Sequence, residues 1–138
     1  MACGKPRGTR DTERGRRKNG FMDELRWRTK RFAIETIKFV EQLDKSMTSN
    51  VIGKQLIRAG TSVGVNYRAA KRAKSNPDFI AKMGIVEEET DECMYWLELL
   101  VEAGKIASEN SRELILEANR ILGMMVNSIK TARVRLSS

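Results

Sequence analysis

Apolar residues recur at alternating three- and four-residue steps over four long segments of the chain, which predicts four amphipathic helices. We expect these helices at about 22–47, 51–74, 76–104 and 108–136. The inward stripes are Leu25, Phe32 and Phe39; Ile52, Leu56, Ala59, Val63, Asn66, Ala70 and Ala73; Phe79, Met83, Val86, Thr90, Cys93, Leu97 and Leu100; and Leu114, Ala118, Ile121, Met125, Ile129, Ala132 and Leu136. No segment alternates with the two-residue period of a half-buried strand.

Turn and capping residues separate the four segments. The candidates are Ser49 and Asn50 before the second helix, Asn76 with Pro77 before the third, Gly104 after the third, and Asn110 with Glu113 as a capping box of the fourth. Short connections between long helices predict an all-α, antiparallel up-down-up-down four-helix bundle. Residues 22–138 would form this bundle as one domain.

Residues 1–21 differ in composition from the rest of the chain. They are rich in Gly, Arg and Lys and have few large apolar side chains, so we expect a disordered basic tail. Two interpretations compete: an expressed basic arm, or a misassigned start with Met22 as the true initiator. The second is favoured.

Composition narrows the chemistry. Apolar residues make up 41% of the chain and aromatic residues 6%, which suits a bundle packed by aliphatic side chains. Histidine is absent, which removes the commonest general base and metal ligand. Cys3 and Cys93 lie in unlike surroundings and predict neither a disulfide framework nor a zinc site. We therefore expect no enzyme, no cofactor and no metal site, and a soluble, cytoplasmic protein without a membrane span.

The net charge of +8 is unevenly distributed along the chain. Residues 1–21 carry seven cations and two acids, a net +5, which leaves +3 for the rest. In an up-down bundle, segments 22–38, 66–84 and 126–138 meet at one end and carry +2, +4 and +3, or +9 together. We call this end the basic pole; the remaining segments, the acidic pole, sum to −6. The basic pole favours contact with RNA or DNA, against the alternative of ordinary solvated helix ends.

Polar and acidic residues inside the helical pattern offer weaker candidates. Ser62, Asn66 and Thr90 fall on inward stripes and suggest a hydrogen-bonded network that fixes helix register, in preference to a buried polar site. The acids between 87 and 92 are spread around a helix, so they do not predict a metal site. Glu88 and Glu92 share a side of the helix and are predicted to pair with arginines of the second helix or of a neighbouring subunit.

An ordered series of motifs resembles the four-helix-bundle family named for the 23S rRNA intervening-sequence proteins. The matching stretches are Gln55–Arg58, Thr61–Ala70, Arg72–Ser75, Asp78–Phe79, Glu88–Glu89, Asp91–Glu92, Tyr95–Leu100 and Glu117–Asn119. The resemblance spans residues 22–136 and implies an antiparallel bundle that assembles into a closed ring, a pentamer. The implied fold is also similar to the accessory proteins of diversity-generating retroelements, which pair with a reverse transcriptase and bind nucleic acid.

Together these features predict a self-assembling adaptor that binds RNA or DNA, with a reverse transcriptase or another protein as partner. A purely structural or protein-binding oligomer is the alternative. The predicted nucleic-acid-binding residues are Arg26, Arg28, Lys30, Arg31, Arg68, Lys71, Arg72, Lys74, Lys130, Arg133 and Arg135. The predicted oligomer interface consists of Gly60 and Gly64, which thin the second helix, and of Tyr95, Trp96 and Leu99, which make the third too apolar for a lone bundle. A Trp96 buried inside the bundle is the alternative.

Overall fold

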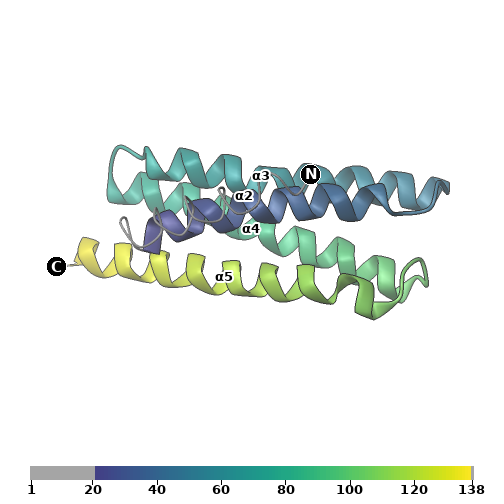
Figure 1. The fold of residues 1–138 in the computed structure, drawn as a ribbon. Coiled ribbons are helices and arrows are strands. Elements are labelled where there is room, and N and C mark those ends of the chain that lie inside the picture. The colour runs from purple at the N-terminus through teal and green to yellow at the C-terminus, as the bar shows by residue number, and fades with distance from the viewer. Residues whose placement is uncertain (1–20, 138) are drawn as a thin grey trace, which may run out of the picture.

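The computed structural model describes residues 21–137 as four α-helices joined by short turns (Figure 1). The helices are α2, Phe21–Glu41; α3, Met47–Lys71; α4, Asn76–Glu102; and α5, Ser108–Ser137. The predicted basic tail lies outside the described residues, except for Phe21, which opens α2. All regular structure in the described part is helical, as the apolar periodicity predicts.

Successive helices run in opposite directions. Gly53, near the start of α3, faces Val40 near the end of α2, whereas Gly64 farther along α3 faces Thr29 near the start of α2. The α3–α4 turn lies at one end of the molecule, and the α2–α3 and α4–α5 turns lie at the other (Figure 1). Each helix packs against two others in the cyclic order α2, α3, α4, α5, and α2 and α5 touch least. The chain is an up-down-up-down four-helix bundle.

The core is formed by the four predicted stripes. Leu25, Phe32, Leu56, Leu97 and Met125 are all within 1% of complete burial, and most other stripe positions are also buried. Leu136 is an exception, with half of its side chain exposed, because the end of α5 projects past the neighbouring helices (Figure 1). The core therefore ends before the last turn of α5.

The turn between α2 and α3 differs from the prediction. Ser46 is the N-cap of α3, and its Oγ accepts a hydrogen bond from the Ser49 N–H at 3.1 Å. The Asp44 carboxylate in turn accepts the Ser46 N–H at 2.9 Å. The prediction of Ser49 and Asn50 as caps was wrong by one turn, because Asp44 and Ser46 already form the tight turn and allow α3 to begin earlier.

The other boundaries agree more closely with the sequence. Ser75, rather than Asn76, is the N-cap of α4, with Pro77 in its first turn as predicted. Gly104 has a φ of +76°, and the N–H groups of Gly104 and Lys105 bond to carbonyls of Val101 and Leu100. This is the left-handed C-terminal cap for which glycine is favoured. The predicted capping box at Asn110 was wrong, because α5 already begins at Ser108.

Candidate nucleic-acid interface

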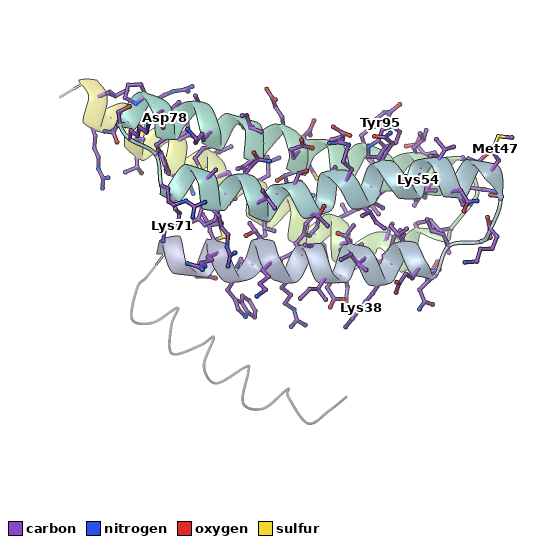
Figure 2. The ribbon with its side chains drawn as sticks, turned by 90° about the horizontal axis from the view of Figure 1, so that it is seen from above. Lys38, Met47, Lys54, Lys71, Asp78 and Tyr95 are labelled. Carbon is purple, nitrogen blue, oxygen red and sulfur yellow. The ribbon has the colours of Figure 1, made fainter. Side chains whose placement is uncertain are left out.

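The start of α2, the end of α3, the start of α4 and the end of α5 meet at one end of the bundle, where the sequence places the basic pole. Figure 2 shows Lys71 and Asp78 at this end and Met47 at the opposite end. Ten of the eleven predicted nucleic-acid-binding side chains are exposed: Arg26, Lys30, Arg31, Arg68, Lys71, Arg72, Lys74, Lys130, Arg133 and Arg135. The fold therefore brings cations from distant parts of the sequence to one end.

Arg28 has a different role from the other predicted cations. Its side chain is only 18% exposed, and its Nη1 donates to both Glu117 oxygens at 2.9 and 3.0 Å while its Nε donates to Glu24. Burial alone would lower the pKa of Arg28, but the hydrogen bonds to Glu117 and Glu24 raise it above its ordinary value. Arg28 thus joins α2 to α5, and its guanidinium group is engaged by Glu117 and Glu24.

Three cations near the α3–α4 turn have no acidic partner among the described side chains. Lys71 forms no ion pair within 4 Å with any described acid, and the same holds for Arg68 and Arg72. Asp78, the acid nearest this turn, bonds to Lys82 Nζ at 2.6 Å, which lowers the pKa of its carboxyl. The local acid is therefore already compensated by a cation of its own helix.

The acids of α4 pair with α3, as expected from the sequence, although the pairs differ in detail. Arg58 bonds to Glu89 at 3.2 Å and to Glu92, while Glu88 is exposed. A hydrogen bond from the Trp96 indole, with help from Arg58, holds the pKa of Glu92 below its ordinary value. Within residues 21–137, no three acidic or cysteine side chains gather in a way that could hold a metal ion.

Gly60 and Gly64 permit close packing inside the chain. A Cβ built on Gly60 would lie 2.7 Å from Thr36 Cγ2, and one on Gly64 would lie 3.5 Å from Thr29 Oγ1. Both glycines therefore face α2 of the same chain. Packing within one chain therefore explains the small residues of α3. The remaining predicted interface residues are Tyr95, Trp96 and Leu99.

Those candidates lie along α4. Tyr95 is 55% exposed, whereas Trp96 and Leu99 are partly buried against the core. The rings of Tyr95 and Trp96 meet edge to face at a centroid distance of 5.1 Å, and Trp96 donates to Glu92 Oε2 at 3.0 Å. Ile85, which is also exposed, lies nearly three turns before Tyr95 in the same helix. The outer side of α4 thus presents aromatic and aliphatic groups.

The inward polar residues form no network between helices. Thr90 Oγ1 donates to the Val86 carbonyl, Ser62 Oγ donates to that of Arg58, and Asn66 Nδ2 donates to that of Ser62. The predicted register-fixing network was therefore wrong, because each group is satisfied one turn back in its own helix.

Burial raises the pKa of the Cys93 thiol to about 12, so this cysteine remains protonated near neutral pH.

A cleft of about 730 Å³ opens at the basic pole between residues 70–79, around the α3–α4 turn, and residues 127–135 of α5. We call it the pole cleft. Small side chains at Ala70, Ala73 and Ala132 leave this space between the helix ends, and Lys71, Lys74 and Arg135 line it. Phe79 forms part of its apolar wall.

Sequence reasoning predicted Arg135 on the α5 side of this cleft but missed Ser128. Ser128 is 8% exposed and lines the cleft, and its Oγ has no hydrogen-bond partner among the described groups. The available signal was its place three residues after Met125 and four before Ala132, on the inward side of the fourth helix. A serine among alanines and methionines at such a position marks a buried hydroxyl.

Comparison with known proteins agrees with the geometry. The sequence profile of the 23S rRNA-intervening sequence protein family matches residues 24–127. A crystal structure of a protein of unknown function from the S23 ribosomal protein family, from Bacteroides thetaiotaomicron, is 31% identical in sequence with a TM-score of 0.75. The match covers 80% of this chain and 99% of that one. No curated protein matches this chain significantly.

Among the helices of residues 21–137, none combines the length and the apolar character that a membrane crossing demands.

Proposed function

This chain belongs to the 23S rRNA-intervening sequence protein family, and from that premise we propose that it is a non-enzymatic, oligomeric adaptor whose basic pole binds RNA or DNA. The observation that carries the proposal is the convergence of exposed cations from α2, from the end of α3 and the α3–α4 turn, and from the end of α5 on one end of the bundle. Nucleic acids carry closely spaced phosphates, which such a surface can engage without reading base sequence. The similarity of the fold to that of retroelement accessory proteins favours a nucleic-acid enzyme, such as a reverse transcriptase, as the partner of this chain.

Charge separation supports this orientation. The acidic pole would repel phosphates while the basic pole attracts them, so the molecule would approach a nucleic acid end-on. If copies assemble around a rotation axis along the bundle, their basic poles share one face of the ring and the phosphate-binding surface is multiplied.

The test compares two charge-matched triple variants of the full chain. Lys71→Ala, Arg72→Ala and Lys74→Ala remove cations from the basic pole, and Lys45→Ala, Lys54→Ala and Arg112→Ala remove exposed cations near the opposite end. Binding of a labelled RNA and of a DNA of the same sequence is measured over a salt series. Because each lost phosphate contact reduces the salt slope by about 0.7–0.9, the pole variant should lose about two units of slope and at least tenfold in affinity.

The control variant should bind within about twofold of wild type, since it carries the same net charge as the pole variant but keeps the pole intact. Equal losses in both variants would assign binding to net charge or to residues 1–20. Absence of salt-dependent binding by the wild-type chain would refute the proposal.

The alternative function, a structural or protein-binding oligomer without nucleic-acid contact, is favoured by the exposed ring of Tyr95 beside Trp96. Self-association through this side of α4 is common to both functions, and we propose a ring of five copies. Light scattering should give a mass near five chains, and Tyr95→Lys should lower it. Val51→Lys, at a similarly exposed apolar position on α3, is the control. A monomeric wild-type protein at micromolar concentration would contradict the ring.

A further inference from the structure

The pole cleft contains a buried hydroxyl that the fold does not satisfy. Hydroxyls in helices usually donate to the carbonyl one turn earlier, as Thr90 and Thr131 do here at 2.8 and 3.0 Å. Ser128 Oγ makes no such bond, although its residue is only 8% exposed. A buried polar group without a hydrogen-bond partner destabilises the folded state. Ser128 also lines the pole cleft, where a bound polar group would supply the missing partner after a turn about its Cα–Cβ bond.

The charged wall of the cleft fits a phosphate. Lys71 and Lys74 line it from the α3–α4 turn, and Arg135 lines it from α5. The first turn of α4 borders the same space, so its helix dipole adds a favourable field for an anion. Asp78, the acid of that turn, is paired with Lys82 and leaves the positive potential of the wall in place.

The remaining wall fits a base. Phe79 and the alanines offer apolar surface, and Asn76 and Asn127 offer amide donors and acceptors beside it. The volume of about 730 Å³ lies within the range of roughly 300–1,000 Å³ found for small-molecule sites. The cationic wall suits the phosphate of a nucleotide, the aromatic ring suits the face of its base, and the amide groups suit the edge of its base.

We propose that the pole cleft receives one unpaired nucleotide, with its phosphate on Lys71, Lys74 and Arg135 and its base against Phe79, where the base edge reaches Ser128. The proposal rests on the proposed function and adds a preference to it. A base in a duplex is stacked and paired, so it enters the cleft only after costly extrusion. Single strands and bulges are therefore preferred over duplexes of the same charge.

The experiment measures binding of a labelled single strand and of its blunt duplex to the full chain at equal salt. Wild type should prefer the single strand at least fivefold. Ser128→Ala should reduce that preference without loss of folding, because it removes a hydroxyl that lacks a partner in the free protein. Ala73→Leu should abolish the preference by filling the cleft, and Ala81→Leu, at an exposed position on α4, is the matched control.

Two outcomes separate this proposal from the proposed function. Equal binding of single strand and duplex by wild type, or a preference that survives Ala73→Leu, would overturn the cleft proposal and leave nucleic-acid binding intact. Absence of binding to either would overturn both. Competition by a 5′-mononucleotide identifies the source: displacement at micromolar concentration shows a free nucleotide as ligand, and displacement only by oligonucleotides shows a nucleotide within a strand.

Discussion

At the residue scale, the close packing of α2 against α3 depends on Gly60. The Cβ position at this residue lies 2.7 Å from Thr36 Cγ2. Thr36 cannot turn aside freely, because its Oγ1 donates to the Phe32 carbonyl at 2.8 Å and the side chain is completely buried. The absence of a side chain at Gly60 therefore sets the distance between α2 and α3.

We predict that Gly60→Ala lowers the free energy of unfolding by about 1–3 kcal/mol, because the added methyl group forces α2 and α3 apart. Gly123→Ala is the control, since its Cβ would meet nothing within 4 Å in α5. It should stabilise the protein by about 0.5–1 kcal/mol through higher helix propensity. Urea denaturation followed by circular dichroism measures both, and a stabilised Gly60→Ala would contradict the packing argument.

The sequence predicts much of the fold but less of the site at this scale. Periodicity identified Leu56, Leu97 and Met125 as core because apolar spacing directly reports which side of a helix is buried. It assigned Gly60 to a subunit contact, since a small residue indicates a close neighbour without saying which one. It missed Ser128 because an unsatisfied hydroxyl is a property of packing between helices, which local spacing does not encode.

At the scale of elements, α2 and α5 form the loosest side of the bundle, and Arg28 and Glu117 join them. Sequence position counted Arg28 in the basic pole but could not show that Glu117, from a segment counted in the acidic pole, would occupy its guanidinium group. Similarly, Ser46 could be distinguished from Ser49 as the cap only by the turn geometry that Asp44 sets.

We predict that a double-mutant cycle on Arg28→Ala and Glu117→Ala gives a coupling free energy of about 1 kcal/mol, because both side chains are partly buried and Arg28 Nη1 donates to both Glu117 oxygens. Each single variant should lose more stability than the corresponding alanine variants of Lys38 and Glu35, an exposed pair that serves as the control cycle. Thermal or urea unfolding provides the values. A coupling within error of zero would mean that apolar packing alone holds α2 against α5.

At the scale of the whole molecule, the two poles differ in charge, and carboxylates form hydrogen bonds at several places where helices begin or meet. Hydrogen bonds involving Ser46 lower the pKa of Asp44, Lys82 lowers that of Asp78, and Trp96 lowers that of Glu92. In the unfolded chain these groups return to their ordinary values of 3.8 for Asp and 4.5 for Glu. The unfolded chain therefore binds more protons in mild acid.

We predict that stability is fully present above about pH 5 and falls as the pH drops through 4 toward the lowered pKa values of the folded state. Protonation of the acidic pole also leaves the cations of the chain without compensation, which adds repulsion. Urea midpoints at pH 7, 5 and 3 measure this. Asp44→Asn should be less stable at pH 7 and lose less on acidification; an unchanged pH dependence in that variant would contradict a role for Asp44.

The weak contact between α2 and α5 also affects the order of folding. Contacts of α3 with α4 and of α4 with α5 join neighbours in sequence, so they form after the closure of short loops. The bond between Arg28 and Glu117 joins residues 89 apart and must close a loop of most of the bundle for the least contact. We therefore expect the docking of α2 onto α5, which closes the bundle between its first and last helices, to be the late step of folding.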